Sequence, residues 1–164
     1  MDMERQMNPH ELLDVLTQPA ELVETLEQGS LRCLACAHRC LLKPGRRGIC
    51  GVRFNANGVL MAPKGYVAGV QIDPLEKKPF NHFLPGSEVL TFGMLGCNFH
   101  CGFCQNWLSS QALRDPEAGR SAYAIRRVSA EKLVTYAVEN GARAIASSYN
   151  EPLITTEWAV EVFK

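Results

Sequence analysis

The chain has 164 residues, of which 46% are hydrophobic and 21% are charged, values typical of one globular domain with a buried core. Its 17 basic and 17 acidic residues give a net charge of zero, so charge does not indicate a nucleic-acid or membrane-surface partner. No apolar run approaches the ~20 residues of a membrane span. Residues 1–7 lack the basic head and apolar core of a secretory signal. We therefore expect a cytoplasmic protein that binds neither nucleic acid nor membrane.

The first 30 residues predict two helices. Asn8 suits an N-cap, Pro9 suits a first helical turn, and Glu11 completes a capping box. After an interruption, apolar residues resume over 22–26 and stop at Gly29, which predicts a second helix. We expect the two helices to form a hairpin that packs against the rest of the chain.

All seven cysteines fall into two clusters, and the first occupies residues 33–50, here called the first cysteine segment. Clustered cysteines without an export signal indicate a metal site rather than a disulfide framework. Four thiolates can close a tetrahedral Zn²⁺ site or hold an Fe–S cluster, and a closed site leaves no position for catalysis. Unliganded thiols are the alternative, and we expect His38 to lie beside the site or at the surface. The four candidate ligands, spaced C-x2-C-x3-C-x9-C, are Cys33, Cys36, Cys40 and Cys50.

A tight hairpin is predicted at Asn57-Gly58, followed by a strand over 66–72. The next stretch, residues 73–86, contains three prolines and a glycine, which exclude regular structure over most of its length. The spacing favours a solvated loop. Because long loops are often functional, the alternative is that its polar residues bind a polar substrate group. These residues are Asp73, Glu76, Lys77, Lys78 and His82.

The second cluster follows a predicted strand over 88–95 and places Cys97, Cys101 and Cys104 in C-x3-C-x2-C spacing. This stretch, residues 97–104, is here called the cysteine loop. Protein-bound [4Fe–4S] clusters usually take four cysteines, so a loop with three thiolates leaves one iron open. An open iron is a position at which chemistry can occur.

The remaining elements predict a strand–helix–strand–helix order. After an irregular stretch over 108–127, a helix with Ser129 as N-cap runs to residue 140 and is followed by a buried strand over 142–148. This order implies a parallel sheet with right-handed crossovers. Ligands in such sheets bind at the carboxyl ends of the strands. The cysteine loop and the polar turn at 149–152 should therefore face one site.

The cysteine loop, with Phe103 before its last cysteine, resembles the signature loop of the radical S-adenosylmethionine (SAM) superfamily. Further stretches together resemble the radical SAM enzyme of the AmmeMemoRadiSam system, which is related to pyruvate formate-lyase activating enzymes. The resemblance begins near residue 31 and runs to the end of the chain. The matching stretches are C-L-A-C-A-H-R-C, G-R-R-G-I-C-G-V-R, D-P-L-E-K-K-P-F-N-H-F-L-P-G, G-C-N-F-H-C-G-F-C-Q-N-W and Y-N-E-P.

The resemblance implies that Cys97, Cys101 and Cys104 ligate three irons of a [4Fe–4S] cluster, while SAM chelates the fourth through its amino and carboxylate groups. Reductive cleavage of SAM would then give a 5′-deoxyadenosyl radical that abstracts a substrate hydrogen. The substrate is unknown and could be a protein. An electron donor such as flavodoxin or ferredoxin is implied by this chemistry, and no side chain is assigned a catalytic role.

The resemblance also assigns cofactor contacts outside the cysteines. Phe103 would lie against the adenine of SAM, and Asn150 and Glu151 would lie near its methionyl amino group. The alternative for Asn150 and Glu151 is a helix N-cap followed by a first-turn carboxylate.

The fold class expected from the resemblance is α/β, the N-terminal part of a partial (β/α) radical SAM barrel preceded by a Cys-rich extension of helices and strands. The division is N-terminal helices at 1–30, a Cys-rich metal-binding extension and linker loop at 31–86, and an incomplete barrel at 87–164. A complete barrel takes ~250 residues, so we expect the N-terminal portion of a longer enzyme that does not cleave SAM alone. A non-catalytic metal-binding protein and an electron-transfer Fe–S protein are the alternatives.

Overall fold

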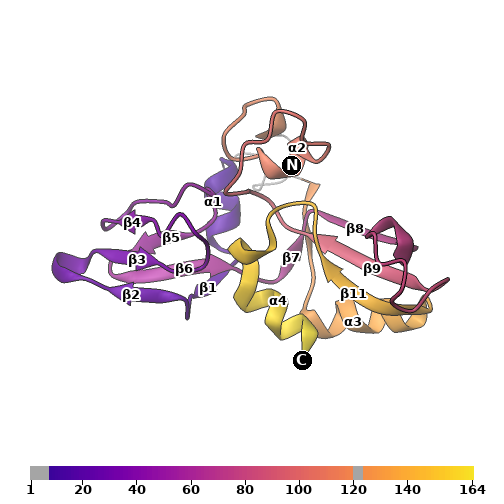
Figure 1. Cartoon of the computed structure of the whole chain (residues 1–164). Coiled ribbons are helices and arrows are strands. Elements are labelled where there is room, and N and C mark those ends of the chain that lie inside the picture. Colours follow the sequence, from indigo (N-terminus) through magenta and orange to yellow (C-terminus); the bar gives the residue numbers. More distant parts are fainter. Residues whose placement is uncertain (1–7, 120–123) are drawn as a thin grey trace, which may run out of the picture.

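The computed structural model (Figure 1) describes residues 8–119 and 124–164. Residues 1–7, and residues 120–123 within the stretch predicted to be irregular, lie outside the described residues. The α-helices are α1 (Pro9–Asp14), α2 (Trp107–Ser110), α3 (Ala130–Glu139) and α4 (Thr156–Phe163), and the 3-10 turns are η2 (Glu27–Gly29), η3 (Leu75–Lys77) and η5 (Pro152–Thr155). The strands are β1 (Thr17–Pro19), β2 (Val23–Thr25), β3 (Leu31–Cys33), β4 (Leu41–Leu42), β5 (Phe54–Ala56), β6 (Val59–Pro63), β7 (Tyr66–Val67), β8 (Gly69–Pro74), β9 (Glu88–Gly93), β10 (Arg126–Arg127) and β11 (Ala142–Ser147).

The strands form several small sheets. Three of these, ordered β1-β6-β5, β2-β3-β4 and β10-β7, are antiparallel. The fourth has the order β11-β9-β8, in which β9 is parallel to β11 and antiparallel to β8. Figure 1 shows the N-terminal sheets on one side of the molecule and the β11-β9-β8 sheet on the other, with α3 and α4 below it. The sheets cross both boundaries expected from the sequence, because β1 pairs with β6 and β8 pairs with β9.

The predicted fold class, a partial (β/α) barrel, is wrong. A (β/α) barrel needs successive parallel strands, each followed by a helix. Within the described residues only β9 and β11 pair in parallel, and every other strand pairing is antiparallel. The sheets of this part of the chain do not close into a barrel. The architecture is a small mixture of helices and short sheets.

The N-terminal helix is confirmed, whereas the second predicted helix is wrong. Asn8 Oδ1 accepts a hydrogen bond from Glu11 N at 3.0 Å, and Glu11 Oε2 accepts one from Asn8 N at 3.1 Å, which completes the capping box of α1. Residues 23–25 instead form β2, in which Val23 lies opposite Cys33. The apolar pattern was too short to fix a helix against strand pairing with β3, because tertiary contacts override weak propensities.

The hairpin at Asn57-Gly58 is confirmed, because β5 and β6 pair on either side of it and both turn residues have positive φ, at 51° and 94°. The strand predicted over 66–72 is divided. Its first part, β7, pairs with β10, and its second part, β8, pairs with β9. The helix capped by Ser129 is also confirmed, because Ser129 Oγ accepts a hydrogen bond from Lys132 N at 3.2 Å.

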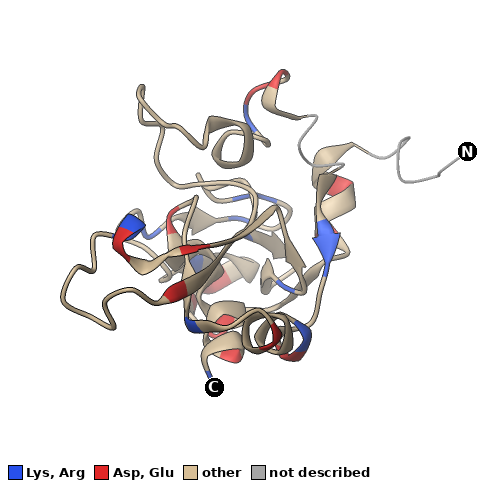
Figure 2. Cartoon of the chain, turned by 90° about the vertical axis from the view of Figure 1, so that its right-hand side faces the viewer, with Lys and Arg blue, Asp and Glu red and all other residues tan. Residues whose placement is uncertain are grey.

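The main core lies between the β11-β9-β8 sheet and the helices α3 and α4. Phe92 of β9 meets Trp158 of α4 edge to face, with ring centroids 5.3 Å apart, and Leu133 of α3 belongs to the same buried cluster. A smaller cluster around Leu31 and Leu42 holds the N-terminal sheets. Acidic and basic residues are interspersed along the side of the molecule drawn in Figure 2. Among the described residues, no helix is long and apolar enough to cross a membrane.

Candidate metal and cofactor site

The carboxyl ends of β9 and β11 lie side by side. Their parallel pairing places Ser147 opposite Phe92, and Ser148 N donates a hydrogen bond to Phe92 O at 2.8 Å. A Cβ at Gly93 would lie only 2.5 Å from Ser148 O and 2.8 Å from Tyr149 Cδ2. Glycine at this position therefore allows the turn after β11 to approach the end of β9, from which the cysteine loop departs.

The turn after β11 presents two buried polar groups without partners. Asn150 Oδ1 accepts a hydrogen bond from Met94 N at 3.4 Å, directly after β9. Asn150 Nδ2 and Glu151 Oε2 are buried and have no hydrogen-bond partner among the described residues. An unpaired buried polar atom is unfavourable by about 1–3 kcal/mol. An amide donor and a carboxylate acceptor are therefore available to a polar ligand at this end of the sheet.

The cysteine loop lies in a stretch, residues 94–106, without helix or strand. Cys97 is buried, Cys104 is half-buried and Cys101 is exposed. Phe99 N donates a hydrogen bond to Cys97 Sγ at 3.5 Å, and Cys104 Sγ lies 3.4 Å from Ser110 Oγ. These contacts orient two of the three sulfur atoms.

The three thiols fit an Fe–S cluster in their chemistry but are not gathered in this structure. Among the described residues, no three His, Cys, Asp or Glu side chains lie close enough together to hold a metal ion. All three cysteines are free thiols, and thiolates are the usual ligands of Fe–S clusters.

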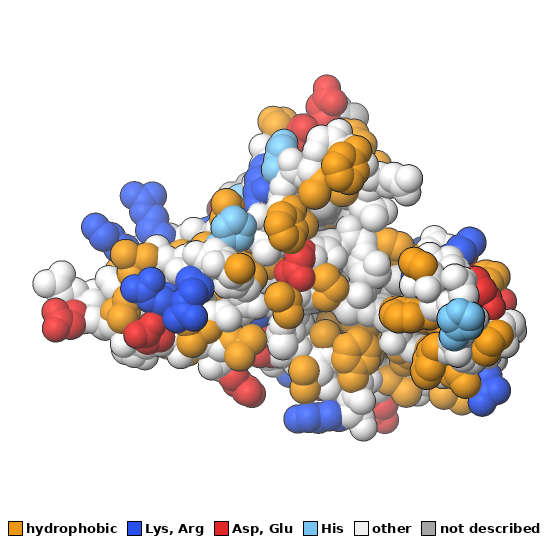
Figure 3. Space-filling view, in the orientation of Figure 1, with side chains coloured by type: hydrophobic (Ala, Val, Ile, Leu, Met, Phe, Trp, Pro, Cys, Tyr) orange, Lys and Arg blue, Asp and Glu red, His pale blue; other side chains and the backbone are white. Residues whose placement is uncertain are grey.

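The cysteine loop and its flanking residues protrude from the molecule and carry exposed apolar side chains (Figure 3). Phe103, expected to lie against an adenine, is 89% exposed, and Phe99 is 54% exposed. The structure therefore places Phe103 at the surface of the loop with its ring open to solvent.

The first cysteine segment is held by strands. Cys33 ends β3, and its N–H donates a hydrogen bond to Cys40 O at 3.0 Å. Burial raises the pKa of the Cys33 and Cys50 thiols. The N–H of Ala35 lowers the pKa of Cys33, whereas the nearby thiols of Cys40 and Cys36 raise it. The thiols of Cys36, Cys40 and Cys50 each lie within electrostatic reach of Cys33, although the four do not form a metal-binding group among the described residues.

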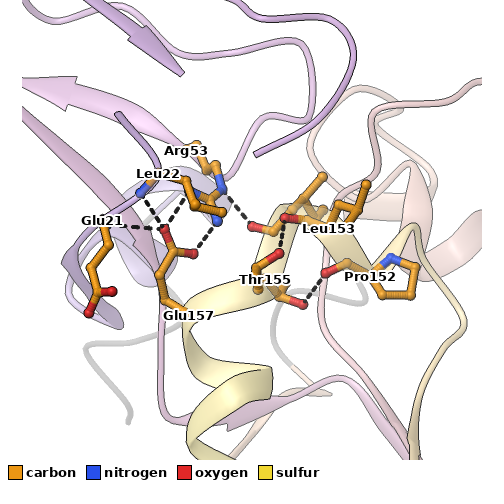
Figure 4. Close-up of polar contacts among 9 residues, drawn as sticks. Glu21, Leu22, Arg53, Pro152, Leu153, Thr155 and Glu157 are labelled. Carbon is orange, nitrogen blue, oxygen red and sulfur yellow. Dashed lines mark hydrogen bonds and ion pairs between the residues drawn. The ribbon is translucent and has the colours of Figure 1, made fainter. Parts of the chain in front are cut away.

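Arg53 and Glu157 form a buried ion pair that the sequence did not indicate (Figure 4). Their side chains are 1% and 6% exposed, and Arg53 Nε donates a hydrogen bond to Ile154 O at 2.8 Å. Burial alone would raise the pKa of Glu157, but the hydrogen bonds and charge of Arg53 outweigh it and hold that pKa below 4.5. The pair attaches the chain just after Cys50 to η5 and α4. The two residues are 104 positions apart, so no local pattern could have revealed the contact.

The polar residues of the loop over 73–86 mostly contact one another. Lys77 forms an ion pair with Asp73, and Glu76 Oε1 accepts a hydrogen bond from Gly86 N at 2.7 Å. Lys78 differs, because its Nζ lies 5.5 Å from the ring centroid of Tyr149 in the turn after β11. Of the five residues proposed for this loop (Asp73, Glu76, Lys77, Lys78 and His82), Lys78 is therefore placed beside the candidate site, and His82 is exposed.

One relative of known sequence is similar to most of this chain. The uncharacterized protein MJ0808 of Methanocaldococcus jannaschii is 38% identical over 140 residues, which cover 85% of this chain and 40% of that protein. The chain thus spans about 40% of the length of this relative. No family model and no solved structure matches the chain. The comparison with solved structures therefore does not support the expected barrel either.

Proposed function

We propose that this chain binds a [4Fe–4S] cluster and SAM as part of a radical SAM enzyme of the activating-enzyme-like group. One observation carries the proposal. A loop with three free thiols leaves the end of β9, and at the same end of the parallel strand β11 a turn carries a buried amide nitrogen and a buried carboxylate oxygen without partners among the described residues. Ligands of open sheets bind at such ends.

The cysteine loop supplies the metal ligands in this proposal. Cys97, Cys101 and Cys104 would each give a thiolate to one iron. The hydrogen bond from Phe99 N to Cys97 Sγ orients that sulfur. When bound, such a cluster supplies one-electron reduction of the SAM sulfonium and so the means to abstract a substrate hydrogen. The protein's part is to bind, to orient and to exclude water.

The turn after β11 supplies complementary groups for an amino acid. Glu151 Oε2 is an acceptor suited to an ammonium group, and Asn150 Nδ2 is a donor suited to a carboxylate. The hydrogen bond from Met94 N fixes the Asn150 amide so that its nitrogen remains free for a ligand. The ring of Phe103, 89% exposed, is available to stack on an adenine.

The substrate, which could be a protein, and an electron donor of the flavodoxin or ferredoxin type complete the proposed reaction in the whole protein. All seven cysteines are free thiols, a state maintained in reducing compartments. We accordingly propose the cytoplasm as the location.

For the first cysteine segment we propose a second, structural site that holds Zn²⁺ or another Fe–S cluster. Its ligands would be Cys33, Cys36, Cys40 and Cys50, the last three of which lie within electrostatic reach of Cys33. Four thiolates satisfy tetrahedral Zn²⁺ and leave no open position. Metal analysis of the purified chain distinguishes the two metals, because Zn²⁺ predicts zinc in the Cys101→Ser variant and a second cluster predicts iron there.

The test of the main proposal is anaerobic reconstitution of the chain with iron and sulfide, followed by electron paramagnetic resonance of the reduced protein. We expect the spectrum to change when SAM is added. A cluster that is reduced reversibly and ignores SAM would instead indicate an electron-transfer protein. Failure to take up iron at the cysteine loop would indicate a non-catalytic metal-binding protein.

Matched variants assign the response to residues. Cys101→Ser is expected to abolish the SAM-dependent change, whereas Cys36→Ser is expected to impair folding. Glu151→Gln removes the charge while it preserves the shape of the side chain, so it should retain iron and weaken the response to SAM. An unchanged SAM response in Glu151→Gln would contradict the role of the turn.

A further inference from the structure

The first cysteine segment and the cysteine loop contact each other directly. A Cβ at Gly96, where φ is +83°, would lie 2.6 Å from Cys50 O and 2.8 Å from Val52 Cγ1. His38 Nε2 donates a hydrogen bond to Asn98 O at 3.0 Å. The backbone before Cys97 is thus packed against the end of the first cysteine segment, and the backbone after Cys97 is bonded to its middle.

Arg114, which follows α2, forms hydrogen bonds with both segments. Its Nη2 donates hydrogen bonds to the carbonyl oxygens of Ile49 and Cys97, and its Nη1 donates one to Phe99 O at 3.2 Å. Ile49 precedes the proposed ligand Cys50, and Cys97 is itself a proposed ligand. One side chain therefore holds the backbone beside a ligand in each group.

The geometry of these bonds requires a guanidinium. Arginine presents five N–H donors in a rigid planar fork, whereas lysine has a single ammonium on a flexible stem. The Phe99 carbonyl has a second donor, Gln111 Nε2, at 3.1 Å. Removal of Arg114 would leave the Phe99 carbonyl bonded to Gln111, but it would remove the hydrogen bonds to the carbonyls of Ile49 and Cys97. The specific contribution of Arg114 is the link between the two segments.

Arg114 also brings a positive charge to the backbone carbonyl of Cys97, one of the proposed cluster ligands. A positive charge near a metal–thiolate group favours its more negative, reduced state. The side chain is exposed, so solvent screens part of this interaction. The variant Arg114→Lys therefore separates the effect of charge from that of hydrogen-bond geometry, because lysine keeps the positive charge but lacks the planar guanidinium.

We propose that Arg114 is a positioning residue that holds the cysteine loop against the first cysteine segment and stabilises the reduced cluster, an inference that rests on the proposed function. The contacts of Arg114 are with backbone carbonyl oxygens and involve no metal ligand atom, so its positioning role can also be measured in the metal-free protein.

The experiment compares wild type, Arg114→Ala, Arg114→Lys and the control Arg46→Ala in the full chain. Arg46 is an exposed arginine of the first cysteine segment whose side chain has no hydrogen bond or ion pair with the described residues. Retention of loop iron is measured during challenge with a chelator, and the midpoint potential of the reconstituted cluster is measured by titration. Hydrogen exchange of the Phe99 amide is followed in the metal-free proteins.

For Arg114→Ala we expect cluster retention to weaken roughly tenfold to 100-fold, as is typical when residues that orient metal ligands are removed. Its midpoint potential should become more negative, and Phe99 should exchange faster. Arg114→Lys should restore the potential but not the retention, because it returns charge without the fork. Arg46→Ala should match wild type in all three measurements.

Equal retention, potential and exchange in Arg114→Ala and wild type would overturn the inference. If wild type takes up no cluster, the proposed function fails, and exchange of the Phe99 amide in the metal-free variants still decides the positioning role. Circular dichroism of each variant separates these effects from loss of folding. A drop in retention shared by Arg46→Ala would likewise count against a role specific to Arg114.

Discussion

The two groups of cysteines differ in how the backbone holds them. The first cysteine segment begins on β3, is paired by β2 and β4, and buries Cys33 and Cys50. The cysteine loop has no helix or strand, and Cys101 is exposed. A closed and buried set of thiols suits a structural metal, whereas an open set leaves room for a further ligand. Our proposal accordingly assigns stability to one group of thiols and ligand binding to the other, on the basis of the backbone around each.

The largest expected change in stability comes from removing one proposed metal ligand from each group. Cys36→Ser should remove metal from the first cysteine segment and unfold the β2-β3-β4 sheet, because structural zinc contributes on the order of 10 kcal/mol in small metal-dependent folds. Cys101→Ser should leave stability near that of wild type. Denaturation with urea in metal-loaded protein measures both. If the two variants lose similar stability, the division into a structural and a binding group is wrong.

A smaller effect is expected at the attachment of the first cysteine segment to α4. Glu157→Ala leaves Arg53 buried without its partner, which should lower the free energy of unfolding by roughly 3–5 kcal/mol. The matched control is Glu161→Ala on the same helix, whose partner Lys64 is 43% exposed, and exposed pairs contribute about 0–1 kcal/mol. Chemical denaturation compares them, and equal losses would show that Arg53 is not held by this pair.

The junction of the two groups can be tested at Gly96. Gly96→Ala and Gly141→Ala both place alanine at positive φ, +83° and +74°, which is unfavourable by about 1–2 kcal/mol. Only Gly96→Ala also meets backbone, at Cys50 O, and overpacking adds about 1–3 kcal/mol. Thermal or urea unfolding should show this excess. A Gly96→Ala loss no greater than that of Gly141→Ala would mean that the segments separate readily.

The smallest effect is a pH dependence from Glu157. Its pKa is lower in the folded chain than the ordinary value of 4.5, so the unfolded chain binds a proton more readily and stability rises with pH in this range. The contribution of Glu157 is fully present above about pH 4.5 and is lost as the pH falls through the folded pKa. The stability difference between wild type and Glu157→Gln should therefore shrink below that pH. A difference that stays constant down to acid unfolding would contradict this assignment.

Local signals in the sequence predicted the elements that local contacts fix. The capping box of Asn8 and Glu11, the Asn57-Gly58 turn and the Ser129 N-cap each act within four residues, and each is present in the structure. The apolar stretch at 22–26 failed as a helix because its partner, β3, is set by pairing and not by periodicity. The 66–72 strand was divided because its two ends pair with different strands.

Individual side-chain contacts between distant residues were beyond the reach of the sequence. The order of elements predicted a parallel sheet with the cysteine loop and the 149–152 turn at one edge, and β9 and β11 do pair in parallel. It gave no information on Arg53, His38 or Arg114, whose partners lie far away in the chain. The barrel expectation failed for a related reason. A motif identifies a loop, but the number and direction of strands around it depend on pairings that the motif does not encode.

The missing side chain of Gly93 sets the spacing between the two strand ends. Any Cβ there would overlap Ser148 O and the ring of Tyr149, so the turn could relax only by moving away from β9. Such a movement would carry Asn150 away from Met94 and shift the adjacent Glu151 with it. In a saturation mutagenesis screen, position 93 should consequently accept glycine alone, even though no atom of its side chain could ever contact a ligand.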